Sequence, residues 1–287
     1  MLTRLPMKTL MRRHARLECS ASHGDWRDAC VAFPKESINF LYADPPFNTG
    51  QSKRTPPGAF KSGRTCEAEY ADAFGSPRDF INWLRPRVEA SVPLLKPTGL
   101  ICLHIDWRTS HHVRLLLDDL LGEDRFVNHL IWSYGLGGSS PRRFARKHDD
   151  LLLYCLDPEE YWFDPPRVPA TSNRLRGQTK KATDVLDIPS INNMAAERTG
   201  YPTQKPLALL ELLVRACCPP GGVVLDPCCG SGTTLVAAVR CGRWAVGLDI
   251  SPEAVALSRR RLAGPECRTT PSDSAPERPP GRTMISE

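Results

Sequence analysis

A carboxylate at the end of a short apolar strand is the first feature of this chain that suggests chemistry. Residues 38–43 are apolar and β-prone, and Asp44 follows them directly. Open α/β sheets bind their ligands at the carboxyl ends of strands. Pro45 and Pro46 fix the next stretch of backbone, and Phe47 places an aromatic face beside the carboxylate. The motif predicts a rigid pocket for a flat, amine-bearing group, whereas a strand that ends in a Pro-rich turn is the simpler alternative.

A glycine turn far downstream predicts the other half of the same site. Residues 223–225 form an expected strand that ends at Asp226, and a turn with two glycines leads into a helix over 233–241. The turn lacks the third glycine of a dinucleotide fingerprint, and Asp226 is unfavourable beside a pyrophosphate but suits the positive methionyl group of S-adenosylmethionine. The acid after the next strand is expected to hold ribose hydroxyls. The candidate cofactor-binding residues here are Asp226, Pro227, Gly230, Gly232, Thr233, Thr234 and Asp249.

The remaining elements must come from the N-terminal half, because only one more helix follows Asp249. We therefore expect a single doubly wound α/β sheet that includes both halves of the site. Residues 51–75 are predicted to form a long polar loop. Periodicity and turn signals predict strands at 14–20, 100–105, 126–134, 151–156 and 244–248, and helices at 77–95, 110–121, 207–217 and 252–262.

Composition divides the chain into four parts. Residues 14–134 are expected to form the catalytic half and residues 201–263 the cofactor-binding half. Between them, residues 135–200 are basic, rich in proline and poor in helical periodicity, apart from the strand at 151–156, which indicates an inserted lobe. The tail, residues 264–287, is rich in Pro, Ser and Arg and is expected to be disordered, and residues 1–16 form a basic arm.

Basic residues gather in three stretches that contain no acid, within a net charge of +6. These stretches are residues 51–65, 139–148 and 173–181. Singly, each is most simply a solvated surface; together, beside a predicted pocket, they favour a nucleic acid partner. The candidate DNA-binding residues are Lys53, Arg54, Arg142, Arg143, Arg146, Lys147, His148, Arg174 and Arg176.

Cysteine spacing and hydropathy exclude other classes. The 11 cysteines include no C-x-x-C pair, so we expect reduced thiols in a cytoplasmic protein and no metal site. The longest apolar runs fall well short of a bilayer, so no membrane-spanning segment is expected.

Several unlike motifs in one order give the chain a family resemblance. The Asp44–Phe47 motif, the segment Tyr201–Pro206 and the glycine turn at 226–234 resemble those of DNA methyltransferases that methylate the N6 amine of adenine or the N4 amine of cytosine. The order resembles the permuted β class, and the likeness covers roughly residues 18–262. It implies a Rossmann-like, S-adenosylmethionine-dependent methyltransferase sheet in circularly permuted motif order, with a target-recognition lobe at 135–200.

The resemblance also assigns roles to individual residues. It implies that Asp25 contacts the cofactor's adenine and that Thr203 and Lys205 lie near its methionine end. Cys228 stands where the family usually has phenylalanine. The implied partners are double-stranded DNA, a second copy of the chain and a cognate restriction endonuclease.

The resemblance leaves two possible target bases, adenine methylated at N6 and cytosine methylated at N4. In the resembling family, Asp-Pro-Pro with Phe or Tyr is more typical of N6-adenine and Ser-Pro-Pro-Tyr of N4-cytosine, so adenine is preferred over cytosine. Two other classes are a DNA-binding regulator that has lost catalysis and a methyltransferase acting on RNA or a protein amide. The intact motif at Asp44 argues against the first, and the basic loops favour duplex DNA over the second.

Overall fold

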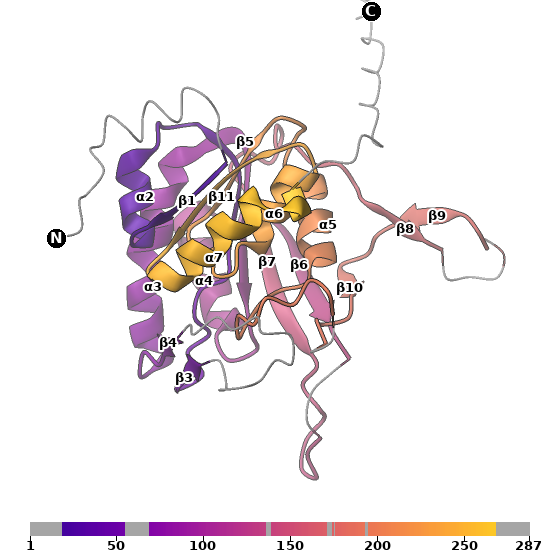
Figure 1. Cartoon of the computed structure of the whole chain (residues 1–287), viewed down its shortest axis with the longest axis horizontal. Helices are drawn as coiled ribbons and strands as arrows, with labels where there is room; N and C mark the ends of the chain where they lie inside the picture. Colours follow the sequence, from indigo (N-terminus) through magenta and orange to yellow (C-terminus); the bar gives the residue numbers. More distant parts are fainter. Residues whose placement is uncertain are drawn as a thin grey trace, which may run out of the picture.

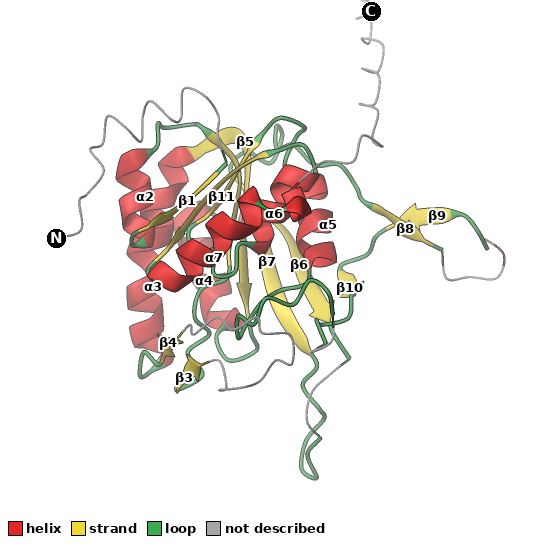
Figure 2. Ribbon diagram, in the orientation of Figure 1, coloured by secondary structure: helices red, strands yellow, loops and turns green. Residues whose placement is uncertain are grey.

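The fold is built on a large sheet with helices on both faces (Figures 1 and 2). The computed structural model describes residues 19–54, 69–135, 139–170, 174, 176–192 and 195–267. Within these ranges, the strands of the main sheet are β1 (Ser20–His23), β2 (Ile38–Ala43), β5 (Leu95–Ile105), β6 (Phe126–Ser133), β7 (His148–Cys155), β10 (Val185–Asp187), β11 (Val223–Asp226) and β12 (Trp244–Asp249).

The strand order interleaves the two halves of the chain. It is β1-β12-β11-β2-β5-β7-β6-β10, and all described neighbours pair in parallel except β7, which is antiparallel to β5 and β6. Strand β11 from the C-terminal half lies directly beside β2, with Val224 opposite Phe40. The prediction that both halves of the site share one sheet is therefore confirmed.

The helices cover the sheet from both sides. Helices α2 (Trp26–Ala32), α3 (Pro77–Ser91) and α4 (Ser110–Leu121) pack on one face, and α5 (Leu207–Cys217), α6 (Thr233–Arg240) and α7 (Pro252–Ala263) on the other. Strand β2 is buried along its whole length because its side chains alternate between these layers. Phe40 and Tyr42 enter the core beneath α5 and α6, whereas Leu41 and Ala43 enter the core beneath α3 and α4.

Polar caps fix where two of these helices begin. The Ser76 hydroxyl accepts a hydrogen bond from the Asp79 backbone N–H at 3.2 Å, and the Asp79 carboxylate accepts one from the Ser76 N–H at 3.0 Å. The Ser251 hydroxyl accepts from the Ala254 N–H at 3.2 Å and caps α7. Both starts agree with the sequence prediction.

Several boundaries differ from the prediction. The helix expected over 77–95 ends at Ser91, and a 3₁₀ turn, η1 (Val92–Leu94), follows, because Pro93 has no N–H to continue an α-helix. The first described strand is β1 at 20–23, where Ala21 is buried and pairs with Gly247 of β12; most of the strand predicted at 14–20 lies outside the described residues. The expected loop at 51–75 contains a hairpin of β3 (Gln51–Arg54) and β4 (Glu69–Asp72).

The described residues include two further short 3₁₀ turns. They are η2 (Glu123–Arg125), before β6, and η4 (Pro265–Cys267), after α7. The predicted basic arm at 1–16 and most of the predicted disordered tail, residues 268–287, lie outside the described residues.

The segment 135–200 contributes to the main sheet. Strand β7 lies between β5 and β6, and β10 forms the edge beside β6. Leu151 to Leu153 of β7 are fully buried, since both faces of the sheet are covered there. A separate hairpin, β8 (Arg167–Pro169) with β9 (Thr179–Lys181), projects from the body of the protein (Figure 1). No helix within the described ranges is long and apolar enough to cross a bilayer.

Candidate functional site

Acidic residues stand at the carboxyl ends of four neighbouring parallel strands. Asp25 follows β1, Asp44 follows β2, and Asp226 and Asp249 are the last residues of β11 and β12. Because these strands run parallel and side by side, their ends meet at one edge of the sheet. All four acids line a single cavity of about 260 Å³. The sequence analysis named each of them, and the fold brings them together.

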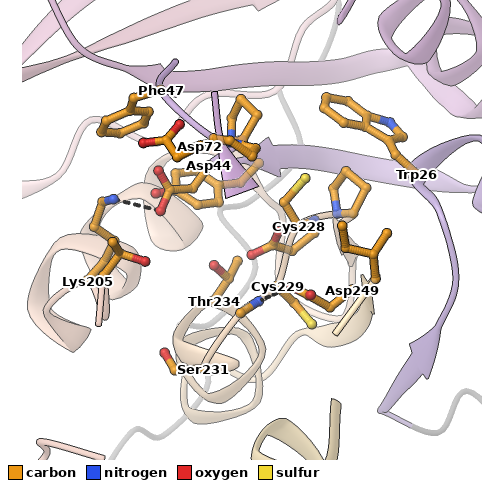
Figure 3. A pocket seen from close by; sticks show the side chains of 18 of the residues that line it. Trp26, Asp44, Phe47, Asp72, Lys205, Cys228, Cys229, Ser231, Thr234 and Asp249 are labelled. Carbon is orange, nitrogen blue, oxygen red and sulfur yellow. Dashed lines mark hydrogen bonds and ion pairs between the residues drawn. The ribbon is translucent and has the colours of Figure 1, made fainter. Parts of the chain in front are cut away.

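One end of the cavity holds Asp44 with an unexpected partner. The Lys205 ammonium donates a hydrogen bond to Asp44 Oδ2 at 2.6 Å, and Lys205 Nζ lies 4.9 Å from the centroid of the Phe47 ring (Figure 3). The side chains of Lys205 and Asp44 are only 11% and 18% exposed. The resemblance placed Lys205 near a cofactor; the structure joins it to the carboxylate of the Asp44 motif.

The loop after Phe47 is held by an acid that the sequence analysis did not single out. Asn48 has a left-handed backbone, with φ of 58°, and its N–H donates to Asp72 Oδ1 at 2.7 Å. The Thr49 hydroxyl donates to Asp72 Oδ2 at 2.5 Å. Asp72 is 1% exposed at the end of β4. No local pattern marks it, because the residues that it holds, Asn48 and Thr49, come before β3, the other strand of the hairpin.

A buried histidine supports Phe47 from behind. The Nδ1 atom of His104 is 2.7 Å from the Tyr42 hydroxyl, and its Nε2 atom is 3.2 Å from Asp149 Oδ2. The His104 ring lies 5.9 Å from that of Phe47. Burial alone would raise the pKa of Asp149, but the hydrogen bond and charge of His104, with the charge of Lys205, lower it. His104 is fully buried, which agrees with a role in packing.

The centre of the cavity contains a carboxyl group with no basic partner. Asp226 is 2% exposed, and no ion pair joins it to a cation among the residues that the structure describes. Its Oδ1 accepts a hydrogen bond from the Cys228 N–H at 3.1 Å. Burial raises the pKa of Asp226 to about 7, and the Thr234 hydroxyl bonded to it only partly opposes this effect.

The glycine turn after Asp226 packs closely against two neighbouring side chains, Tyr201 and Ser258. Gly230 and Gly232 have backbone φ angles of 50° and 76°, which residues other than glycine rarely adopt. A Cβ atom on Gly230 would lie 3.1 Å from the Tyr201 ring, and one on Gly232 would lie 2.6 Å from the Ser258 hydroxyl. The Gly230 N–H donates to Asp249 Oδ2 at 2.8 Å, so Asp249 fixes the turn.

The helix that follows the turn uses its first two threonines differently. The Thr233 hydroxyl accepts a hydrogen bond from Arg261 Nη1 at 3.0 Å, whereas the Thr234 hydroxyl donates a hydrogen bond to the Asp226 carboxyl group. Both threonines line the cavity, as do Pro45, Pro46, Pro227 and Thr203.

The far end of the cavity is aromatic and contains an ion pair. Asp25 Oδ2 accepts a hydrogen bond from Arg87 Nη2 at 2.5 Å, and the Arg87 guanidinium lies 4.1 Å above the Trp83 ring. Burial opposes ionisation of Asp25, but the Arg27 N–H and Arg87 outweigh it and lower its pKa. Trp26 lies at the opposite side of the cavity from Lys205 (Figure 3). Trp83 lies within the helix predicted at 77–95, and no local pattern marks it as part of a site.

Comparison with known proteins identifies the family. The model of the N6/N4 methyltransferase family, described as DNA methylase, matches residues 38–260. The chain belongs to this DNA methylase family.

Relatives and solved structures of DNA methylases agree with that assignment. The chain is 27% identical over 256 residues to the DNA adenine methyltransferase YhdJ of Escherichia coli (strain K12), which covers 84% of this chain and 81% of YhdJ. Its fold is similar to that of the PvuII cytosine-N4-specific DNA methyltransferase, with a TM-score of 0.63 over 90% of each chain at 17% identity. The complex of M1.HpyAVI with SAM gives a TM-score of 0.59 at 20% identity, over 85% of this chain and 98% of that one.

The predicted DNA-binding residues of this methylase occupy separate places. Residues 139–147 leave the sheet between β6 and β7, where Ser133 pairs with His148, so this loop emerges at the same edge as Asp44. Its exposed basic residues are Arg142, Arg143, Arg146 and Lys147, and His148 is half-buried at the start of β7. Lys53 and Arg54 belong to β3.

The third basic group is not gathered with the others. Arg174 and Arg176 are exposed beside the β8–β9 hairpin, which projects away from the loop between β6 and β7 (Figure 1). Arg146 of the loop between β6 and β7 packs on an aromatic ring: its guanidinium lies 3.3 Å from the centre of the Trp107 ring. Trp107 follows the end of β5, so this contact ties the loop to the cavity edge of the sheet.

Proposed function

We propose that this DNA methylase transfers a methyl group from S-adenosylmethionine to the exocyclic N6 amine of an adenine flipped out of duplex DNA. The observation that carries the proposal is the shared cavity: Asp44 and Phe47 line the same space as Asp226 and the glycine turn. A hydrogen-bond acceptor beside an aromatic face suits a flat base with an amine. The chain's membership of the DNA methylase family supports the same conclusion.

The cavity suits the positively charged cofactor. Asp226 is buried with no basic partner among the described residues and has a pKa of about 7, so a sulfonium cation nearby would favour its ionised form. Gly230 lines the cavity, and without a side chain its backbone is open to close approach by a ligand. We assign Thr203, Lys205 and Asp226 to the methionine end, Asp249 to the ribose, and Asp25 to the adenine end.

The chain's own residues would then activate the target amine. The lone pair of this nitrogen is delocalised into the ring, which makes the amine a poor nucleophile. Asp44 and the Pro45 carbonyl accept its two N–H groups and turn the lone pair out of the ring plane, while Phe47 stacks on the base. Bound S-adenosylmethionine supplies the electrophilic methyl group. A new N–C bond forms as the S–C bond breaks, and the proton lost from nitrogen leaves through Asp44 to solvent.

The base must leave the duplex before it reaches this cavity. Unpairing and unstacking cost on the order of a few kcal/mol. We assign residues 139–147 and the β8–β9 hairpin to contacts with the flanking DNA. The permuted order of the family's motifs and a homodimer are further parts of the proposal. Replacing Arg142, Arg143 and Arg146 together with alanine should weaken DNA binding about tenfold or more and reduce its salt dependence, with cofactor affinity unchanged.

Adenine is preferred over cytosine because Asp44-Pro45-Pro46-Phe47 matches the motif more typical of adenine methylation. The adenine methyltransferase YhdJ supports the same choice, at 27% identity. N4-cytosine methylation is the alternative outcome of the test below.

The test is radiolabelled methyl transfer to duplex DNA by the wild type and by Asp44→Ala. The wild type should incorporate label and the variant should not. If both proteins bind DNA and neither incorporates label on any DNA, the chain is a binding protein without catalysis. Sequencing that detects modified bases, on DNA from cells that express the wild type, then gives the base and its sequence; modified cytosine would overturn the choice of adenine.

A further inference from the structure

Lys205 occupies the position that the proposed reaction requires for the target amine. We propose that its ammonium is a stand-in for this amine in the protein without substrates, and that the cofactor's carboxylate draws it away from Asp44 before the base enters. The inference rests on the proposed function, and it adds an order of events: cofactor first, then base. Lys205 is in this view a positioning residue that couples the two halves of the cavity.

The contacts of Lys205 resemble those assigned to the amine. Its nitrogen donates to Asp44 Oδ2 at 2.6 Å and lies 4.9 Å from the centre of the Phe47 ring (Figure 3). A target amine needs the same carboxylate as acceptor and the same ring as a stacking partner. The Asp44 carboxylate can accept more than one hydrogen bond, but an ammonium over the Phe47 ring lies in the space that a stacked base would need, so the base and the lysine compete for this end of the cavity.

The ion pair is sheltered enough to matter. The side chains of Lys205 and Asp44 are 11% and 18% exposed, so water screens their attraction less than it would at the surface. An incoming base must therefore replace the ammonium or find it already displaced. A neutral amine is a weaker partner for a carboxylate than an ammonium is, because charged hydrogen bonds are roughly twice as strong. Displacement needs a second anion.

The backbone around Lys205 is fixed, which leaves the side chain as the moving part. The Gln204 side chain accepts hydrogen bonds from the Thr199 N–H at 2.8 Å and donates to the Glu197 carbonyl at 2.6 Å. The Glu197 carboxylate accepts from the Leu207 N–H at 3.0 Å, at the start of α5. The flexible four-carbon stem of lysine can carry its ammonium between partners while these bonds stay intact.

A second partner is within the same cavity. Thr203, Lys205 and Asp226 line it together, and the proposed function places the methionine end of the cofactor there. The α-carboxylate at that end is an anion, and Asp226 cannot pair with it because Asp226 is itself an acid. Lys205 is the cation nearest to both sites among the described lining residues, since Arg87 is held at the far end by Asp25. Moving Lys205 to this carboxylate frees Asp44.

Such an exchange makes the two ligands cooperative. If cofactor removes Lys205 from Asp44, it raises the affinity for the extruded base, and the base raises the affinity for cofactor by the same factor. The effect requires the cofactor's carboxylate and not its adenosine. This requirement distinguishes the exchange from a general ordering of the cavity by any bound ligand.

The experiment measures base extrusion with two cofactor analogues. The probe is a duplex with 2-aminopurine next to an intact target base, which brightens when the neighbouring base leaves the stack. S-adenosylhomocysteine carries the α-carboxylate, and 5′-methylthioadenosine lacks it. With saturating S-adenosylhomocysteine, the wild type should extrude the base at least tenfold more readily than with 5′-methylthioadenosine or with no analogue.

The variant Lys205→Met keeps the length of the side chain and removes its charge. In this variant the two analogues should give extrusion within about twofold of each other. Lys35→Met is the matched control, since it removes one charge from an exposed turn, and it should keep the wild-type difference. Thermal unfolding checks that each variant folds. If Lys205→Met does not fold, Asp44→Asn provides the second test, because removing the charge on Asp44 should also abolish the difference between analogues.

The outcomes separate the two proposals. A wild type that methylates DNA but responds equally to both analogues overturns the exchange and leaves the proposed function standing. Retention of the tenfold difference in Lys205→Met overturns it as well. A wild type that methylates no DNA overturns the proposed function and the exchange with it.

Discussion

Asp44 and Asp226 end neighbouring strands of one sheet, yet their surroundings are opposite. Asp44 is partly exposed and already paired with Lys205, at 2.6 Å. Asp226 is 2% exposed, has no basic partner among the described residues, and has a pKa raised to about 7 by burial. One acid carries a cation supplied by the protein, whereas the other lies in a place that a cationic ligand would suit.

This difference shows how one architectural position can serve two tasks. Both acids are placed by a strand that ends at the same edge of the sheet. Their chemistry is then set by what packs against them: the segment before α5 brings an ammonium to Asp44, and the glycine turn with α6 closes over Asp226. Changes on one side should therefore alter methyl transfer or cofactor binding selectively, and the following predictions test this separation.

The largest effect is expected from Asp44→Asn. The substitution keeps the shape of the side chain and removes the charged acceptor, so methyl transfer should fall by about 10³-fold or more, equivalent to roughly 4 kcal/mol in the barrier. Cofactor affinity should not fall, because Asp226 is untouched and Asp44 no longer competes with the cofactor's carboxylate for Lys205. Single-turnover methyl transfer and calorimetric titration with cofactor provide the two readouts. A parallel loss of both would show that the two sides of the cavity are not separable.

Asp226→Asn should make the free protein more stable at alkaline pH. The pKa of Asp226 is about 7 in the fold and about 4 in an unfolded chain, so wild-type stability falls as pH rises between these values. The full cost is on the order of 4 kcal/mol above pH 7 and vanishes below pH 4. The variant lacks this term and should exceed the wild type in denaturant unfolding at pH 8 but match it at pH 4. Equal differences at both pH values would refute a raised pKa.

Cofactor affinity should itself depend on pH through Asp226. A sulfonium favours the ionised carboxylate, so S-adenosylmethionine should bind about tenfold more tightly at pH 8 than at pH 6. The neutral thioether of S-adenosylhomocysteine should show a smaller change, and Asp226→Asn should show neither. Calorimetry in two buffers of different ionisation enthalpy would also detect the released proton. A flat profile for both ligands would place the charge interaction elsewhere.

The smallest effect is expected from Asp72→Asn. Asp72 holds the loop after Phe47 through the Asn48 N–H and the Thr49 hydroxyl, and the amide weakens one of these two bonds. A loss of about 1 kcal/mol predicts a roughly fivefold to tenfold fall in methyl transfer, with unchanged cofactor affinity. Asp79→Asn, which alters the cap of α3 nearby, is a control for general destabilisation. An equal fall in the control variant would mean that Asp72 has no specific role at the Asp44 side.

The sequence alone predicted the parts of the fold that depend on local pattern. The mostly apolar run of β2 and the caps at Ser76 and Ser251 specify their elements through neighbours in the chain. The same holds for the glycines at 230 and 232, whose φ values few other residues accept. The prediction missed the β3–β4 hairpin, because a short strand is defined by its partner as much as by its own residues.

The sequence by itself therefore determined which acids stand at strand ends and which turn approaches a ligand, since both follow from short motifs. Only the tertiary structure decided their partners. Lys205 reaches Asp44 across 161 positions of sequence, and Arg87 reaches Asp25 across 62. Long side chains meet wherever packing brings their backbones within reach, and no local spacing encodes that distance. Asp44 and Asp25 therefore obtain their cationic partners from distant parts of the chain.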